Sequence, residues 1–327
     1  MSVTSIIIIV LVAGIACLAI FLIRNIILPK RTATAASQLG KDKILQAIRA
    51  GKAAVEKDPQ SAEAHYLLGR AYLADKRDEQ AFREYRSVSR LGIEGKNIPE
   101  TEFRETIAML YAKFNEGEEA LKEYVLLIKN HPENPEYYYC AGKLFASRNR
   151  PDLAEQYLKK AATLNPKEIR YRSELGMFYY TAKRAKEAQI EFEAALSQNP
   201  NDGMALLYTG KAIKDSKDFA AAIPYLEKAA REPEHKLGAL VELGSCYMSL
   251  KMLDRAIPEL ERAINFIVKD SDIDALYARY FLAMCYEKKQ AYDKAIAQWD
   301  KIYAQKKNFR DVGEKLTQYI EYRQGNK

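Results

Sequence analysis

The amino-acid sequence predicts an all-α fold, a solenoid of helix-turn-helix repeats that follows a single transmembrane helix. Three observations predict this fold. An unbroken apolar run extends from Ile6 to Ile23. From Gly69 to Ala283, small residues recur at intervals of 34 or 39 residues. Prolines recur at the same 34-residue interval instead of gathering in a linker. Such a period is typical of helical repeat proteins, in which each repeat packs only against its neighbours.

The N-terminal apolar run is long enough to cross a bilayer. Its 18 residues would span about 27 Å at about 1.5 Å per residue, and residues 26–28 extend it. No lysine or arginine precedes the run, unlike the start of a cleaved signal peptide, whose apolar core is also shorter. We therefore expect residues 1–31 to form an uncleaved anchor with a basic flank, which contacts the membrane through residues 6–28.

Basic residues indicate the orientation of this anchor. Arg24, Lys30, Arg31, Lys41 and Lys43 all follow the apolar run. The positive-inside rule then places the long C-terminal part of the chain in the cytoplasm. A periplasmic location is the alternative, because a single span offers no second loop against which to check the charges.

A linker and then a repeat array are predicted to follow the anchor. Residues 32–40, TATAASQLG, are short and polar and are assigned to the linker. Beyond them, three columns of residues recur in seven copies. A small residue comes first, an alanine follows 12 residues later, and a large apolar residue comes four residues after that. The small residues are Gly69, Ala108, Gly142, Gly176, Gly210, Gly244 and Ala283; the alanines are Ala81, Ala120, Ala154, Ala188, Ala222, Ala256 and Ala295; the large residues are Tyr85, Tyr124, Leu158, Phe192, Leu226, Leu260 and Trp299.

These columns predict closely packed helical hairpins. A glycine or alanine midway along the first helix lets the second helix approach without an intervening side chain, and the alanine of the second helix gives a matching hollow. Pro132, Pro166 and Pro200 are expected to end second helices, because proline lacks an N–H and clashes within a helix.

The pattern resembles the tetratricopeptide repeat family, which has small residues, aromatics, alanine and proline at these offsets of a 34-residue repeat. The resemblance implies a right-handed superhelical solenoid over residues 41–327. It assigns residues 41–59 to a degenerate leading helix, residues 62–308 to seven repeats and residues 310–324 to a capping helix. Thr209 departs from the pattern because leucine is usual there, and two five-residue insertions near residues 92–97 and 269–274 lengthen turns.

Composition and charge argue against several other classes of function. The net charge is +7, and Arg24, Lys30 and Arg31 account for three of these charges. The positive charge that remains is too small to indicate a nucleic-acid-binding surface. The four cysteines have no CxxC spacing and the three histidines are scattered, so neither a zinc site nor a disulfide framework is predicted.

No motif of catalysis or phosphate binding is predicted either. Gly210-Lys211 lacks the serine or threonine and the upstream glycine of a phosphate-binding loop. We therefore expect no catalytic residues, no cofactor, no metal and no small-molecule substrate. An enzyme or a cofactor carrier is kept only as the alternative from another class.

The resemblance implies a concave face, lined by the first helices, that binds a peptide or a helix of a partner protein. Aromatic, methionine and basic side chains on that face favour a partner segment with apolar and some acidic residues. The residues expected to line the face are Tyr66, Arg70, Tyr139, Lys143, Met177, Tyr180, Lys211, Lys214, Tyr277, Tyr280 and Met284.

The architecture is similar to that of bacterial membrane-anchored proteins of this family. This resemblance implies a scaffold or adaptor, without enzymatic activity, that sits in the inner membrane by a single pass and assists the assembly or regulation of an envelope complex. The alternative places the solenoid in the periplasm as a structural part of an envelope or flagellar machine. The two alternatives differ in the side of the membrane on which the solenoid lies.

Overall fold

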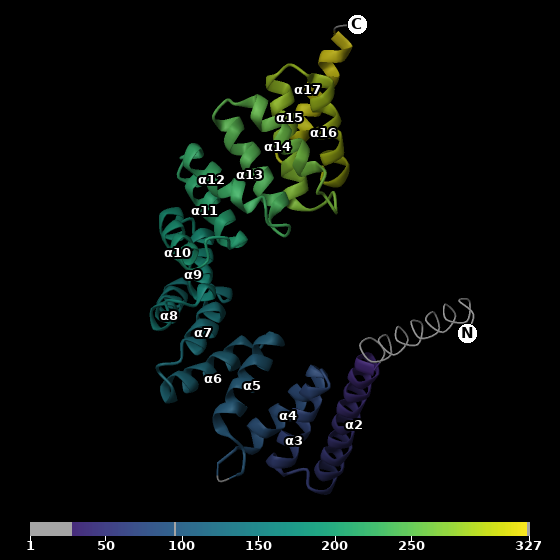
Figure 1. Ribbon diagram of the computed structural model, residues 1–327, viewed down its shortest axis with the longest axis vertical. Helices are drawn as coiled ribbons and strands as arrows, with labels where there is room; N and C mark the ends of the chain where they lie inside the picture. The colour runs from purple at the N-terminus through teal and green to yellow at the C-terminus, as the bar shows by residue number, and fades with distance from the viewer. Residues whose placement is uncertain (1–27, 95, 326–327) are drawn as a thin grey trace, which may run out of the picture. The chain divides into compact units, whose positions relative to one another are not determined.

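The computed structural model describes residues 28–94 and 96–325, and within these ranges it is all-α, with 16 helices and no strand (Figure 1). The all-α solenoid prediction is confirmed. A leading helix comes first, seven helical hairpins follow, and a last helix closes the series. The helices are α2 (Leu28–Lys57), α3 (Ala62–Ala74), α4 (Asp78–Leu91), α5 (Glu100–Lys113), α6 (Gly117–Asn130), α7 (Pro135–Ser147), α8 (Pro151–Leu164), α9 (Ile169–Thr181), α10 (Ala185–Gln198), α11 (Gly203–Asp215), α12 (Phe219–Ala229), α13 (Lys236–Ser249), α14 (Leu253–Ile264), α15 (Ile273–Lys288), α16 (Tyr292–Gln305) and α17 (Val312–Gly325).

The hairpins form two compact units, and among the described residues the first ends at Asn130 and the second begins at His131. In the first unit, the described helices α2 to α6 pack in chain order, each against the next. In the second unit, α7 to α17 pack in the same way, and the first helices α9, α11, α13 and α15 also contact one another in sequence. The division falls after Asn130, the last residue of α6.

The recurring glycines are where the two helices of a hairpin touch. A Cβ placed on Gly244 would lie 2.3 Å from Leu260 Cγ, and a Cβ on Gly176 would lie 2.9 Å from Phe192 Cε1. Each large residue 16 positions later therefore fills the space that the missing side chain leaves. This geometry explains why the column of small residues accompanies the column of large ones in the sequence.

Each hairpin turn has the same geometry. The residue seven positions after each recurring Gly or Ala has a positive φ, as Lys251 does at 61°. The N–H of the following residue donates to the carbonyl four helical positions before the turn, as Met252 N–H does to Tyr247 O. This arrangement is a Schellman motif, which satisfies the last carbonyls of the first helix. The left-handed residues of the seven turns are Lys76, Asn115, Asn149, Lys183, Lys217, Lys251 and Gln290.

Prolines have two different positions in the second helices. The helices α6, α8 and α10 end two residues before Pro132, Pro166 and Pro200, as the sequence predicted. Pro224 and Pro258 instead lie inside α12 and α14. Each lies two residues after the recurring alanine, where the proline ring removes one backbone donor from the middle of the helix.

The segment expected to be a linker, residues 32–40, differs from the prediction. It lies within α2, which runs without a break from Leu28 to Lys57. Its alanines, glutamine and leucine favour helix, and a single glycine at position 40 lowers helix stability only by about 1 kcal/mol. Polar composition was therefore an insufficient sign of a linker.

The predicted membrane segment, residues 6–28, lies outside the described part of the chain except for its last residue. Among the helices that the structure describes, none combines the length and the apolar character needed to cross a bilayer.

Candidate protein-binding face

In each unit by itself, we call the solvent-exposed surface of the first helices (α3 and α5 in the first unit; α7, α9, α11, α13 and α15 in the second) the first-helix face. The eleven residues predicted to bind a partner all lie on these helices. Tyr66 and Arg70 belong to the first unit, and the other nine belong to the second. The structure therefore groups them within units, and each group is described by itself.

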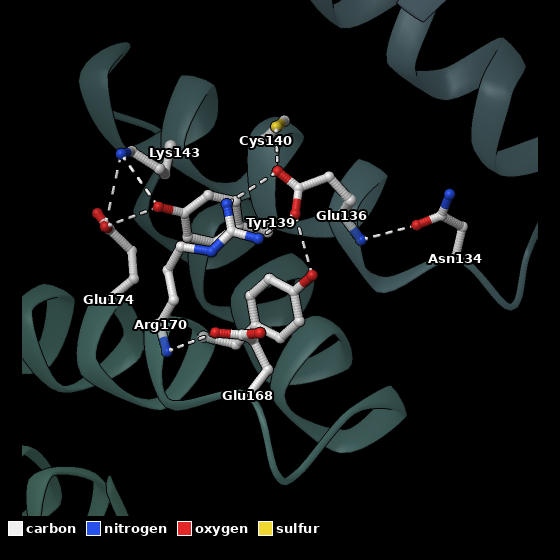
Figure 2. Close-up of polar contacts among 9 residues, drawn as sticks. Asn134, Glu136, Tyr139, Cys140, Lys143, Glu168, Arg170 and Glu174 are labelled. Atoms are coloured by element: carbon white, nitrogen blue, oxygen red, sulfur yellow. Dashed lines mark hydrogen bonds and ion pairs between the residues drawn. The ribbon is translucent and has the colours of Figure 1, made fainter. Parts of the chain in front are cut away.

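The most connected group lies on α7 and α9 (Figure 2). The Tyr139 ring lies 5.3 Å from the Tyr171 ring, and the Arg170 guanidinium lies 4.8 Å from the centre of the Tyr139 ring. Arg170 donates from Nη1 and Nη2 to the two oxygens of Glu136, at 3.2 and 2.6 Å. Two adjacent first helices are thus joined by a tilted pair of rings, a guanidinium over one ring and an ion pair.

Lys143 belongs to the same group. Its Nζ lies 3.5 Å from Glu174 Oε2 and donates to the Tyr139 hydroxyl at 3.3 Å (Figure 2). Burial alone would lower the pKa of Lys143, but the Glu174 carboxylate and the Tyr139 hydroxyl outweigh burial and raise it. Burial and the hydrogen bond to Glu136 raise the pKa of Tyr171 to about 12. These groups therefore keep their ordinary charges at neutral pH.

A second group joins α9, α11 and α13. The Tyr180 and Tyr208 rings lie 5.3 Å apart, and Lys211 Nζ lies 5.1 Å from the centre of the Tyr208 ring. Lys211 also lies 3.6 Å from Glu242, which forms a closer ion pair with Lys214. One glutamate of α13 thus faces two predicted binding cations of α11.

The other predicted residues have similar surroundings. Arg70 lies 3.4 Å from Glu102 of α5 and stacks over the ring of the buried Tyr66. Tyr280 donates to Asp311 Oδ1 at 2.8 Å. The Tyr277 ring packs on the Phe309 ring at 5.2 Å, and Met284 is half-buried in the apolar core of the second unit.

These contacts change the expected charge of the face. Arg70, Lys143, Lys211 and Lys214 each contact a glutamate of the next first helix. Their positive charges are therefore largely compensated within the protein. The four cations face three glutamates, so most of the positive charge that the sequence offered to an acidic partner segment is already paired.

Met177 lines a hollow between α9 and the start of α11, with a volume of about 430 Å³. Its floor includes apolar side chains, and three carboxylates and one guanidinium lie around it. The lining residues are Glu168, Ile169, Arg170, Ser173, Glu174, Met177, Asp202 and Met204. The hollow is large enough for an apolar side chain of a partner, and its carboxylates give it an acidic rim.

Sequence reasoning missed the glutamates and Ser173. Glu174 and Glu242 each lie 31 residues after their lysine, Lys143 and Lys211, so a comparison of columns across repeats would have found the pairs. Ser173 lies three residues before Gly176, where the other copies have Tyr66, Glu105, Tyr139, Leu207, Val241 and Tyr280. A small side chain in a column of larger ones was the signal for a hollow.

The three cysteines that the structure describes are free thiols. Burial raises the pKa of Cys246 to about 12 and that of Cys285 to about 11, so both thiols are protonated and unreactive at neutral pH. Cys140 lies on α7, where its Sγ donates to Glu136 Oε1 at 3.6 Å. Within residues 28–94 and 96–325, no three acidic, histidine or cysteine side chains are placed to hold a metal ion.

The fold and this face define a helical repeat protein whose stacked hairpins present the side chains of their first helices. A tetratricopeptide repeat profile matches residues 32–91, 106–169 and 173–236, and a second profile of the same repeat matches residues 215–280. These matches span more than half of the 327 residues, and the chain belongs to the tetratricopeptide repeat family.

Curated relatives are similar over parts of their length. Anaphase-promoting complex subunit 3 of Schizosaccharomyces pombe is 22% identical over 54% of this chain and 27% of the relative. The BBSome complex member BBS4 homolog of Drosophila melanogaster is 27% identical over 44% of this chain and 32% of the relative. Tetratricopeptide repeat protein 21B of Mus musculus is 28% identical over 38% of this chain and 10% of the relative. The chain therefore spans less than a third of the length of each.

Solved structures share the fold. A tetratricopeptide repeat protein from Parabacteroides merdae superimposes with a TM-score of 0.56 at 14% identity, over 79% of this chain and 98% of that one. The Cut9–Hcn1 hetero-tetramer of the anaphase-promoting complex gives a TM-score of 0.54 at 17% identity, over 84% of this chain and 52% of that one.

Proposed function

We propose that this protein is a membrane-anchored scaffold that binds partner proteins through its first-helix face and catalyses no reaction. The observation that carries the proposal is the first-helix face of the second unit, where methionine, isoleucine and charged side chains line an open hollow of about 430 Å³. Adaptable apolar groups with a few fixed charges are typical of protein-binding surfaces.

The relatives support a role in protein assemblies. Two of them are named as members of complexes, the anaphase-promoting complex and the BBSome. Family membership itself supports protein binding, because stacked repeats form extended surfaces suited to it. We propose that the assembly in question lies at the cell envelope, which rests on the apolar segment at residues 6–28.

Photo-crosslinking tests the binding face. A photoreactive amino acid replaces Met177 on α9, and as a control it replaces the exposed Lys160 on the second helix α8. Crosslinks to other proteins in living cells are expected from position 177 and not from position 160. Crosslinks from position 160 alone would contradict the proposal and move binding to the second helices.

A topology assay tests the anchor. We propose a single pass through the inner membrane with the solenoid in the cytoplasm, and the periplasmic envelope or flagellar component as the alternative. Alkaline phosphatase or a fluorescent protein is fused after Lys327. Fluorescence without phosphatase activity is expected; phosphatase activity would establish the periplasmic alternative, and a fusion that stays soluble after cell lysis would contradict the anchor.

A further inference from the structure

The hollow beside Met177 exists because one repeat has a small side chain where its neighbour has a large one. In α7, Tyr139 lies against α9, with its ring 4.8 Å from the Arg170 guanidinium and its hydroxyl 3.4 Å from Glu174. One repeat later, the position of Tyr139 is occupied by Ser173 and that of Arg170 by Met204. The space that a tyrosine fills between α7 and α9 is therefore left open between α9 and α11.

Ser173 leaves a polar group without a partner at this hollow. Its side chain lines the hollow and the residue is only 4% exposed, yet its Oγ has no hydrogen-bond partner among the described residues. A buried hydroxyl that forms no hydrogen bond destabilises the folded state, because the water that it lost is not replaced. A peptide group or polar side chain inserted by a partner would satisfy it.

The charges around the hollow are predominantly negative. Glu168 and Asp202 cap the N-termini of α9 and α11, where they accept from Arg170 N–H at 3.4 Å and Ala205 N–H at 2.8 Å. Neither carboxylate forms an ion pair within the described part of the chain. Glu174 is shared with Lys143, and the one cation of the rim, Arg170, is bound to Glu136. The rim therefore has acidic charge available to a partner.

We propose that this hollow binds a linear segment of a partner protein that inserts one apolar side chain between Met177 and Met204 and places an arginine or lysine beside Glu168 and Asp202. The inference rests on the proposed function and names the chemistry of its partner. The sequence favoured acidic residues in the partner segment, whereas the hollow favours basic ones, because the lysines of the face are largely paired with glutamates and Glu168 and Asp202 form no ion pair among the described residues.

Peptide display tests the chemistry of the hollow while the partner is still unidentified. A random library of displayed 12-residue peptides is selected on the full chain in detergent, with counter-selection on the Ser173→Tyr variant. The tyrosine of that variant should fill the hollow, as Tyr139 fills the equivalent space between α7 and α9. The expected family of sequences has an apolar residue within a few positions of arginine or lysine. An acidic or charge-free family, or no enrichment at all, would overturn the proposal.

Variants that keep the fold then measure the charge contribution. Asp202→Asn and Glu168→Gln retain the capping oxygen and remove the charge, so the helices should stay intact by circular dichroism. Fluorescence anisotropy with the selected peptide should show affinity weakened about 2- to 5-fold by either change, the range expected of a partly exposed ion pair. The matched control is Asp218→Asn, which removes the same charge from the N-cap of α12, away from the hollow.

The outcomes separate this proposal from the broader one. If Asp202→Asn and Asp218→Asn bind the peptide equally well, the acidic rim has no role and the proposal fails. Crosslinks from position 177 in cells would still support binding at the first-helix face in that case. Absence of those crosslinks together with a basic peptide family would instead contradict the broader function and leave the chemistry of the hollow in place.

Discussion

Thr209 lies in the column directly before the recurring small residue, where other repeats have Leu68, Leu175 and Leu243. It is fully buried, and its Oγ1 has no hydrogen-bond partner in the described structure. Valine has nearly the same shape without the hydroxyl, so Thr209→Val should raise the free energy of unfolding by about 1 kcal/mol. Urea unfolding monitored by circular dichroism measures it. A less stable valine variant would show that the hydroxyl has a partner, such as an internal water.

Gly244 shows how a single atom limits the approach of two helices. Alanine is favoured over glycine in a helix by about 1 kcal/mol, but a Cβ here would lie 2.3 Å from Leu260 Cγ and 2.5 Å from its Cδ2. We expect the overlap to outweigh propensity, so that Gly244→Ala lowers the free energy of unfolding by about 1–3 kcal/mol.

The matched control for this prediction is Gly313→Ala in α17, where the nearest atom is Tyr303 Cε2 at 3.7 Å. That variant should be neutral or more stable by up to about 1 kcal/mol. Equal effects of the two substitutions in thermal unfolding would mean that helix propensity, and not the contact with Leu260, decides the small-residue column.

At the scale of elements, the hairpin turns use a conformation that most of their residues disfavour. Lys183, Lys217 and Lys251 have φ of 64°, 66° and 61°, a region that costs a residue with a Cβ about 1–2 kcal/mol. Lys251→Gly should therefore stabilise the protein by about 0.5–1 kcal/mol, even though glycine makes the unfolded chain more flexible. Asn149→Gly should gain less, because asparagine tolerates this conformation; an equal gain in chemical denaturation would contradict the explanation.

One carboxylate, that of Glu155, takes part in three contacts near the junction of the hairpins α7–α8 and α9–α10. Glu155 of α8 contacts Arg184 at 2.5 Å, Lys159 at 2.6 Å and the Tyr179 hydroxyl at 3.1 Å. The hydrogen bonds from Arg184 and Lys159 lower the pKa of Glu155 to about 2 from a usual value of 4.5. The carboxylate is thus more easily protonated in the unfolded chain than in the folded one.

Linkage fixes the direction of the resulting pH dependence. A lowered folded-state pKa gives stability that is complete above about pH 4.5 and is lost as the pH falls toward about 2. Glu155→Gln should therefore lower the free energy of unfolding by about 1 kcal/mol at pH 7, after allowance for partial solvent exposure, and by less at pH 3. Urea unfolding at pH 7, 5 and 3 measures the gap in the free energy of unfolding between the wild-type protein and the variant. The exposed Glu133→Gln serves as the control, and a gap that does not narrow with acid would contradict the assignment.

At the scale of the whole molecule, the fold could be predicted because the residues that pack together within a hairpin lie at the same short separation in every repeat. Gly176 and Phe192 contact each other at a separation of 16 residues, so one hairpin is readable from one stretch of sequence. The candidate site was less predictable. Lys143 was predicted to line the binding face, but its contact with Glu174 depends on the register between two hairpins. The hollow at Ser173 depends equally on what the next repeat, with Met204, places opposite it.

The last repeat also packs against its neighbours in the chain. Helix α17 covers α16: Val312 is fully buried, the Tyr319 ring stacks on Trp299 at 5.4 Å, and Tyr319 donates to Glu287 Oε1 at 2.7 Å. Leu316, 7% exposed, belongs to the same core. A carboxylate there would lie in an apolar contact, so Leu316→Asp should detach α17 and cost about 2–5 kcal/mol, the range for disrupting a core leucine.

The decisive part of the prediction is which helices lose stability when Leu316 is replaced by aspartate. Stability in a repeat array is a sum of repeats and interfaces between neighbours, so loss of the terminal helix should weaken the nearest hairpin most. In hydrogen-exchange mass spectrometry, Leu316→Asp should remove protection from α15 and α16 while α9 and α10 keep theirs. The conservative Leu316→Met should leave the whole profile unchanged. Uniform loss of protection from α7 to α16 would show instead that the second unit unfolds as one cooperative body, in which case contacts between distant repeats contribute to its stability.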